Sequence, residues 1–127
     1  MKTQRGSLSA LTVCIVLAAV ALAGLVFDVG VAINEYQRLS DLAENAARAG
    51  AQEVIGARSG DVHIDSRAAS ETSRMYLQRF GLFGVIRVSA NSVSVELSKD
   101  SRMQILGLLG LHHRHIHIVR TVHLVSG

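Results

Sequence analysis

A long run without a charged side chain lies near the N-terminus, and it limits the possible folds more than any other feature. The run from Leu8 to Phe27 covers about 20 residues, or about 30 Å as a helix, which matches the hydrocarbon core of a bilayer. Lys2 and Arg5 precede it and Asp28 follows it. Because basic residues favour the cytoplasmic side, we expect a cytoplasmic N-terminus and an external remainder.

A cleaved secretory signal is the competing interpretation. The tripeptide Ala21-Leu22-Ala23 has the small-x-small form that precedes a cleavage site. However, the apolar run continues to Phe27, and helical spacing then continues in a chain that contains no proline. The pattern therefore favours an uncleaved anchor.

Composition indicates a small core built from aliphatic residues. Hydrophobic residues make up 49% of the 127 residues, but aromatic residues only 4%. The single cysteine, Cys14, rules out a disulfide within the chain. Lipid attachment to Cys14 is disfavoured because Val13 precedes it and the apolar run continues after it, so we expect a small packed residue.

Helical spacing continues beyond the apolar run and predicts one helix of about 70 Å from Leu8 to Val54. Its polar side includes Glu44 and Arg48, an acid-before-base pair four residues apart. Its small-residue side either packs on a partner's helix or covers the chain's own sheet. The residues on that side are Ala32, Tyr36, Leu39, Ala43, Ala46, Gly50 and Val54.

Residues 57–65 read as a loop, and a second helix follows it. Asp65 or Ser66 is the expected N-cap and Gly81 the expected stop. Ser70 and Ser73 are expected to be exposed on this helix. Its predicted inner face consists of Ala69, Thr72, Met75 or Tyr76, and Phe80.

Alternating and β-branched residues predict strands at 85–88, 92–98 and 114–125. Ala90-Asn91 forms the first turn, where Asn tolerates a left-handed conformation. Asp100 is the expected cap of a short helix that contains Met103, Leu106 and Leu109 and ends at Gly110.

These elements predict an α+β fold, in which a long N-terminal transmembrane helix continues outside the membrane. There it packs with the second helix on a small antiparallel sheet of about three strands. The expected organisation is a cytoplasmic tip (1–7), a transmembrane helix (8–27), an extracytoplasmic helix extension (28–56) and a small α+β domain (57–127).

Histidines are concentrated near the C-terminus. On a strand, His113, His115, His117 and His123 share one side, opposite Ile116, Ile118 and other core residues. His113, His115 and His117 are the candidate metal ligands, but no cysteine or carboxylate stands at useful spacing in the sequence. The pattern favours a solvated face that gains positive charge below about pH 6.5. Such a face also suits a partner or an anionic envelope polymer.

No pattern for catalysis or nucleic-acid binding is present in the sequence. It contains no base beside a nucleophile, no carboxylate pair and no phosphate-binding loop, so we expect no enzyme and no cofactor. The net charge is +3, but the basic residues form no stripe.

Three segments resemble the TadE/TadG-like proteins. They are Arg-Gly-Ser at 5–7, Ala-Gly-Leu-Val-Phe-Asp-Val-Gly at 23–30, and Gln-Arg-Leu-Ser-Asp-Leu-Ala-Glu-Asn-Ala-Ala-Arg-Ala-Gly-Ala at 37–51. Members of this family are pilin-like, membrane-anchored components of the bacterial Flp (tight adherence) pilus assembly system. The resemblance implies a short cytoplasmic tip and an external domain.

In the pseudopilin branch of this family a prepilin peptidase cuts after a glycine. Gly6 is the matching residue, which would leave Ser7 as the new N-terminus. Such prepilins generally carry a glutamate five residues after the cut, whereas this chain has Leu11. The departure favours an uncleaved anchor, as in TadG-like members, and removes a costly intramembrane charge.

The resemblance implies a non-enzymatic, single-pass subunit or assembly factor of a Flp/Tad-type pilus or its secretion system. Its implied partners are membrane lipid and other pilus components, through the Ala/Gly-rich helix face. The alternative is a secreted or anchored module that uses the histidine strand for metal or anionic polymer. A third hypothesis is a surface regulator that senses acid between about pH 5 and 7. Fractionation separates the first two, because a secreted module would be shortened at Ala23.

Overall fold

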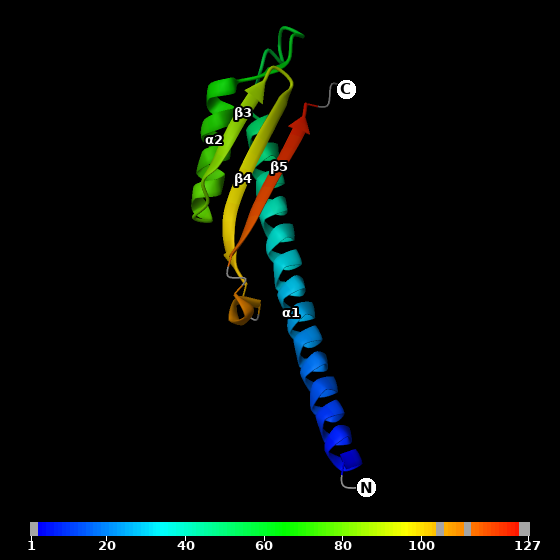
Figure 1. The fold of residues 1–127 in the computed structure, drawn as a ribbon. Coiled ribbons are helices and arrows are strands. Elements are labelled where there is room, and N and C mark those ends of the chain that lie inside the picture. Colours follow the sequence, from blue (N-terminus) through cyan, green and yellow to red (C-terminus); the bar gives the residue numbers. More distant parts are fainter. Residues whose placement is uncertain (1–2, 104–105, 111–112, 125–127) are drawn as a thin grey trace. The chain divides into compact units, whose positions relative to one another are not determined.

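The computed structural model describes residues 3–103, 106–110 and 113–124. It confirms the predicted α+β class (Figure 1). The elements are α1 (Thr3–Ala51), β1 (Val54–Ile55), β2 (His63–Ile64), α2 (Ser66–Arg79), β3 (Gly84–Ser89), β4 (Ser92–Arg102), the 3₁₀ helix η1 (Leu106–Leu109) and β5 (His113–His123).

The chain forms two compact units. Unit 1 comprises Met1–Ile33 and Ser101–Arg114, and unit 2 comprises Asn34–Asp100 and His115–Gly127. Unit 1 therefore contains the apolar part of α1 together with the connection between β4 and β5. Unit 2 contains the rest of α1, α2 and most of the sheet.

Helix α1 is continuous, as the absence of proline predicts, but it ends at Ala51 and not at Val54. Val54 pairs with Ile64, so the predicted loop 57–65 is closed by the two-residue strands β1 and β2. Gly56 lies at the end of this ladder with φ +84°, a conformation that only glycine adopts without strain.

Helix α2 has the predicted boundaries because each of its caps is formed by residues next to that end of the helix. The Asp65 carboxylate accepts hydrogen bonds from the backbone N–H groups of Arg67 and Ala68, at 3.0 and 3.1 Å. At the other end Gly81 has φ +67°, and the N–H of Leu82 donates to the carbonyl of Leu77 at 3.1 Å. This is the arrangement in which a C-terminal glycine stops a helix.

The main sheet has the strand order β3-β4-β5. Strands β3 and β4 are antiparallel, with Ser89 opposite Ser92 across the predicted Ala90-Asn91 turn. Strand β5 runs in the same direction as β3 and opposite to β4 (Figure 1). The predicted left-handed asparagine is wrong, because glycines are the only positive-φ positions among the described residues.

The short helix predicted before Gly110 is present as a 3₁₀ turn over Leu106–Leu109, but its predicted cap at Asp100 is wrong. Strand β4 continues to Arg102, and Asp100 lies within it as an exposed residue bonded to His115 of β5. The only helical turn in the described part of this connection is η1, which Gly110 follows with φ +94°. A cross-strand partner thus holds Asp100 in the sheet.

The core of unit 2 forms where α1 and α2 cover one face of the sheet (Figure 1). Small side chains on α1 let α2 approach closely. A Cβ on Gly50 would lie 2.9 Å from the carbonyl oxygen of Ala69. The core residues are Leu39, Ala43, Ala46, Ala47 and Ala51 of α1; Ile64; Ala69 and Leu77 of α2; Val93, Val95 and Leu97 of β4; and Ile116 and Ile118 of β5.

Several side chains differ from their predicted placement. Ser73, predicted to be exposed, is fully buried, and its hydroxyl donates to the carbonyl of Ala46 at 2.8 Å. Of the predicted alternatives Met75 and Tyr76, Tyr76 packs against the core and Met75 is exposed. Phe80 is also exposed, because α2 packs through Ala69, Ser73 and Leu77, which are four residues apart. Tyr36 and Val54 of the predicted small-residue face are also exposed.

Candidate membrane and partner surfaces

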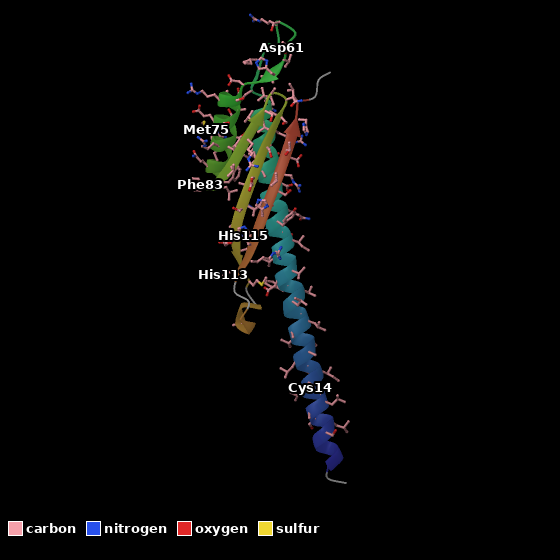
Figure 2. All side chains as sticks on the ribbon, turned by 45° about the horizontal axis from the view of Figure 1, so that its top comes forward. Cys14, Asp61, Met75, Phe83, His113 and His115 are labelled. Atoms are coloured by element: carbon pink, nitrogen blue, oxygen red, sulfur yellow. The ribbon has the colours of Figure 1, made fainter. Side chains whose placement is uncertain are left out.

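The N-terminal part of α1 displays apolar side chains outward. This helix is long and apolar enough to cross a membrane, and only 6% of its most apolar window is buried within the chain. A core helix of the same composition would be covered by its own protein. Cys14, predicted to be a packed residue, is exposed on this surface (Figure 2). The surface is compatible with single-pass membrane anchoring.

The candidate cleavage residues Gly6 and Ser7 lie in the first turns of α1. A Cβ on Gly6 would meet nothing within 4 Å. Leu11, where a prepilin has glutamate, is exposed among the other apolar side chains. Cleavage after Gly6 stays a prediction.

Asp28, the first charged residue after the apolar run, is buried within unit 1. Its exposed fraction is 8%, while its neighbours Phe27 and Val29 are about half exposed. The Asp28 side chain faces a cavity of about 40 Å³, room for a few water molecules at most. The cavity is lined by Asp28, Val29, Val31 and Ala32 of α1 and by Ser101, Met103 and Arg114. Ser101, near the end of β4, and Arg114, at the start of β5, therefore line this cavity together with Asp28.

The outer part of the Ala/Gly-rich face is occupied within the chain. Ala43, Ala46 and Gly50 are buried in unit 2 against α2 and the sheet. Of the two alternatives that the sequence leaves open, coverage of the chain's own sheet holds for residues 39–51. Ala18 and Gly30, in the apolar part of α1, are exposed, whereas Gly24 and Ala32 are buried.

The histidine side of β5 is exposed, as its alternation predicts, and Ile116 and Ile118 face the core. However, carboxylates of β4 meet two of the histidines, which the sequence spacing does not reveal. Nδ1 of His115 donates to Oδ1 of Asp100 at 2.8 Å, and Nε2 of His117 donates to Oε1 of Glu96 at 2.8 Å. The sequence spacing, in which no carboxylate stood at useful distance from these histidines, therefore missed both pairs.

Glu96 has two partners on this face, His117 and Arg87. The hydrogen bond from His117 lowers the pKa of the Glu96 carboxyl below its ordinary value, and the positive charge of Arg87 lowers it further. Nη2 of Arg87 lies 3.6 Å from Oε2 of Glu96. Nearby, the hydroxyl of Thr121 donates to that of Ser94 at 3.1 Å. The outer sheet face is thus a network of paired polar side chains.

The described residues include no group of three histidine, cysteine or carboxylate side chains that could hold a metal ion. His115 and His117 already have carboxylate partners, and His113 belongs to the other unit. Metal binding by His113, His115 and His117 stays a prediction.

Comparison with known protein families finds a match to the segment that contains most of α1. A family model described as "Putative Flp pilus-assembly TadE/G-like" matches the chain from Gly6 to Glu53. Residues 6–53, less than half of the chain, are similar to this TadE/G-like family. The resemblance predicted from the sequence is confirmed over this segment. No curated protein and no solved structure gives a significant match to the chain.

The TadE/G-like segment therefore includes the apolar surface, Asp28 and the face that covers the sheet. Sequence reasoning missed the burial of Asp28 and the partners of the histidines. Strand alternation offers a signal for the partners. Glu96 and Asp100 both occupy outward-facing positions of β4, as the histidines do on β5. The burial of Asp28 has no local signal, because residues far along the chain line its cavity.

Proposed function

We propose that this chain is a membrane-anchored, non-enzymatic subunit or assembly factor of a Flp/Tad-type pilus or its secretion system. The observation that carries the proposal is the coincidence of two features in one helix. The TadE/G-like match over residues 6–53 supports involvement in Flp pilus assembly. The same residues include the exposed apolar surface of α1.

In the proposed arrangement residues 8–27 cross the membrane once, and residues 1–7 stay in the cytoplasm. Lys2 and Arg5 before the run support this orientation. Residues 28–56 and 57–127 then lie outside. The exposed small residues of α1, among them Ala18 and Gly30, allow another helix to approach closely in lipid, so a second pilus component is the proposed partner there.

Deletion of the gene in its native host tests the assembly role. We expect loss of Flp-type pili from the cell surface and recovery on expression of the full chain. Normal piliation of the deletion strain would contradict the proposal.

A charge inside the apolar run tests the anchor separately. Leu17→Asp places a carboxylate near the bilayer centre, which costs roughly 3 kcal/mol of insertion free energy. We expect less of this variant than of Leu17→Ile in membranes washed with alkaline carbonate. Equal retention of both variants, or a chain shortened at Ala23 in the medium, would favour the secreted module.

A further inference from the structure

The connection between β4 and β5 contains a large apolar side chain that is exposed to solvent. Leu108 lies in η1 with an exposed fraction of 86%, the largest among the described large hydrophobic residues. In the sequence, no charged residue occurs between Arg102 and Arg114, apart from the titratable His112 and His113. An exposed apolar side chain that is flanked in the sequence by basic residues is typical of contact with lipid headgroups and the adjoining acyl chains.

Within unit 1, the start of this connection lies next to the residues of α1 that follow the apolar run. Met103, just before η1, lines the same cavity as Asp28 and Val29, immediately after the apolar run. Helix α1 still exposes apolar side chains here, because Val29 and Ile33 are about half exposed. The part of α1 that follows Phe27 and the turn η1 both belong to unit 1, and both expose apolar side chains.

We propose that η1 inserts Leu108 into the lipid interface beside α1, so that the chain contacts the outer leaflet at a second point. Asp28 does not oppose this placement, because its carboxylate is buried in the cavity that Ser101 and Arg114 also line. Ser101, Met103 and Arg114 thus line the cavity beside the first charge of α1. The bilayer is the occupant that this surface fits, because exposed Leu108 and half-exposed Val29 and Ile33 belong to the same compact unit as the apolar run of α1.

The inference rests on the proposed anchor and deepens it. The chain contains no tryptophan, so a single substitution provides a unique fluorescent reporter. The full chain is reconstituted into phosphatidylcholine–phosphatidylglycerol vesicles, with and without bromine on the acyl chains. Leu108→Trp is the test variant. Phe83→Trp is the matched control, because Phe83 is 81% exposed but belongs to unit 2 (Figure 2).

We expect the Leu108→Trp emission to be blue-shifted, to lose most of its intensity in brominated vesicles and to resist aqueous acrylamide. The Phe83→Trp emission should show the opposite behaviour. Circular dichroism of both variants checks that the substitutions preserve the fold. Acrylamide quenching of Leu108→Trp as strong as that of the control, in protein that floats with the vesicles, would overturn the second contact and leave the anchor intact.

Two other outcomes also decide against the proposal. Protection of Leu108→Trp from both quenchers would mean that protein, such as a second copy of the chain, covers η1 in place of lipid. Failure of the unsubstituted chain to float with the vesicles would overturn the anchor and the second contact together.

Discussion

At the scale of single residues, Gly50 sets how closely α1 and α2 pack. A Cβ at this position would clash with the Ser73 hydroxyl and lie 2.9 Å from the carbonyl oxygen of Ala69. Ser73 cannot turn away freely because its hydroxyl donates to the carbonyl of Ala46. We therefore expect Gly50→Ala to lower the free energy of unfolding by about 1–3 kcal/mol, despite the better helix propensity of alanine. Urea unfolding of the full chain in detergent measures this change.

Gly30 in the same helix provides the matched control. A Cβ there would meet nothing within 4 Å, so Gly30→Ala should leave the free energy of unfolding unchanged or raise it slightly. Equal stability of the two variants would contradict the close α1–α2 contact.

The Glu96–His117 pair should make stability depend on pH. The pKa of Glu96 is lowered in the folded chain from its ordinary value of 4.5, chiefly by the hydrogen bond from His117. Its contribution is therefore present above that ordinary value and is lost as the pH falls through the lowered folded pKa. Glu96→Gln should be less stable than the wild type at about pH 6, and the difference should shrink towards about pH 3.

Exposed Glu71 on α2 gives the control for this titration. Glu71→Gln removes a carboxylate but leaves the Glu96–His117 pair intact, so this variant should keep the loss of stability towards about pH 3. A constant stability difference between Glu96→Gln and the wild type across this pH range would show that the pair does not act through the carboxylate.

Single residues also show which side-chain placements the sequence can predict and which it cannot. Alternation on β5 correctly places His115 and His117 outside and Ile116 inside, because a strand has a period of two. Their partners Asp100 and Glu96 follow only from the pairing of β4 with β5, which local pattern does not provide. The burial of Ser73 likewise depends on α1 lying against α2.

At the scale of elements, the N-cap of α2 should contribute measurably to stability. Asp65→Ala removes the acceptor for the N–H groups of Arg67 and Ala68 and should cost about 1 kcal/mol of unfolding free energy. Thermal unfolding followed by circular dichroism detects this loss. Asp61→Ala, in the exposed loop before the cap, is the control, and a loss as large for Asp61→Ala would argue against a capping role.

Elements with local signals were predicted well, and those that depend on distant partners were not. The caps of α2 and the β-branched pattern of β3 are encoded within a few residues. Strand β4 is longer than predicted because Asp100 pairs across the sheet and does not start a helix. Strand β1 ends α1 early because Val54 pairs with Ile64.

At the scale of the whole molecule, the sequence contained enough to predict the fold class and the family resemblance. Both depend on long, regular features: the apolar run, its helical continuation and the TadE/G-like segment. The division into units was not predictable, because unit 1 joins residues before Ile33 to residues after Ser101. Unit 1 contains both buried Asp28 and exposed Leu108.

The central claim is that α1 crosses the membrane and leaves unit 2 outside. Labelling with a membrane-impermeant maleimide in spheroplasts tests it most directly, because Cys14 is the only cysteine of the chain. We predict no labelling of the wild type until detergent is added, and immediate labelling of Ser98→Cys in a Cys14→Ser background. Immediate labelling of Cys14 in intact spheroplasts, or protection of position 98, would contradict the account.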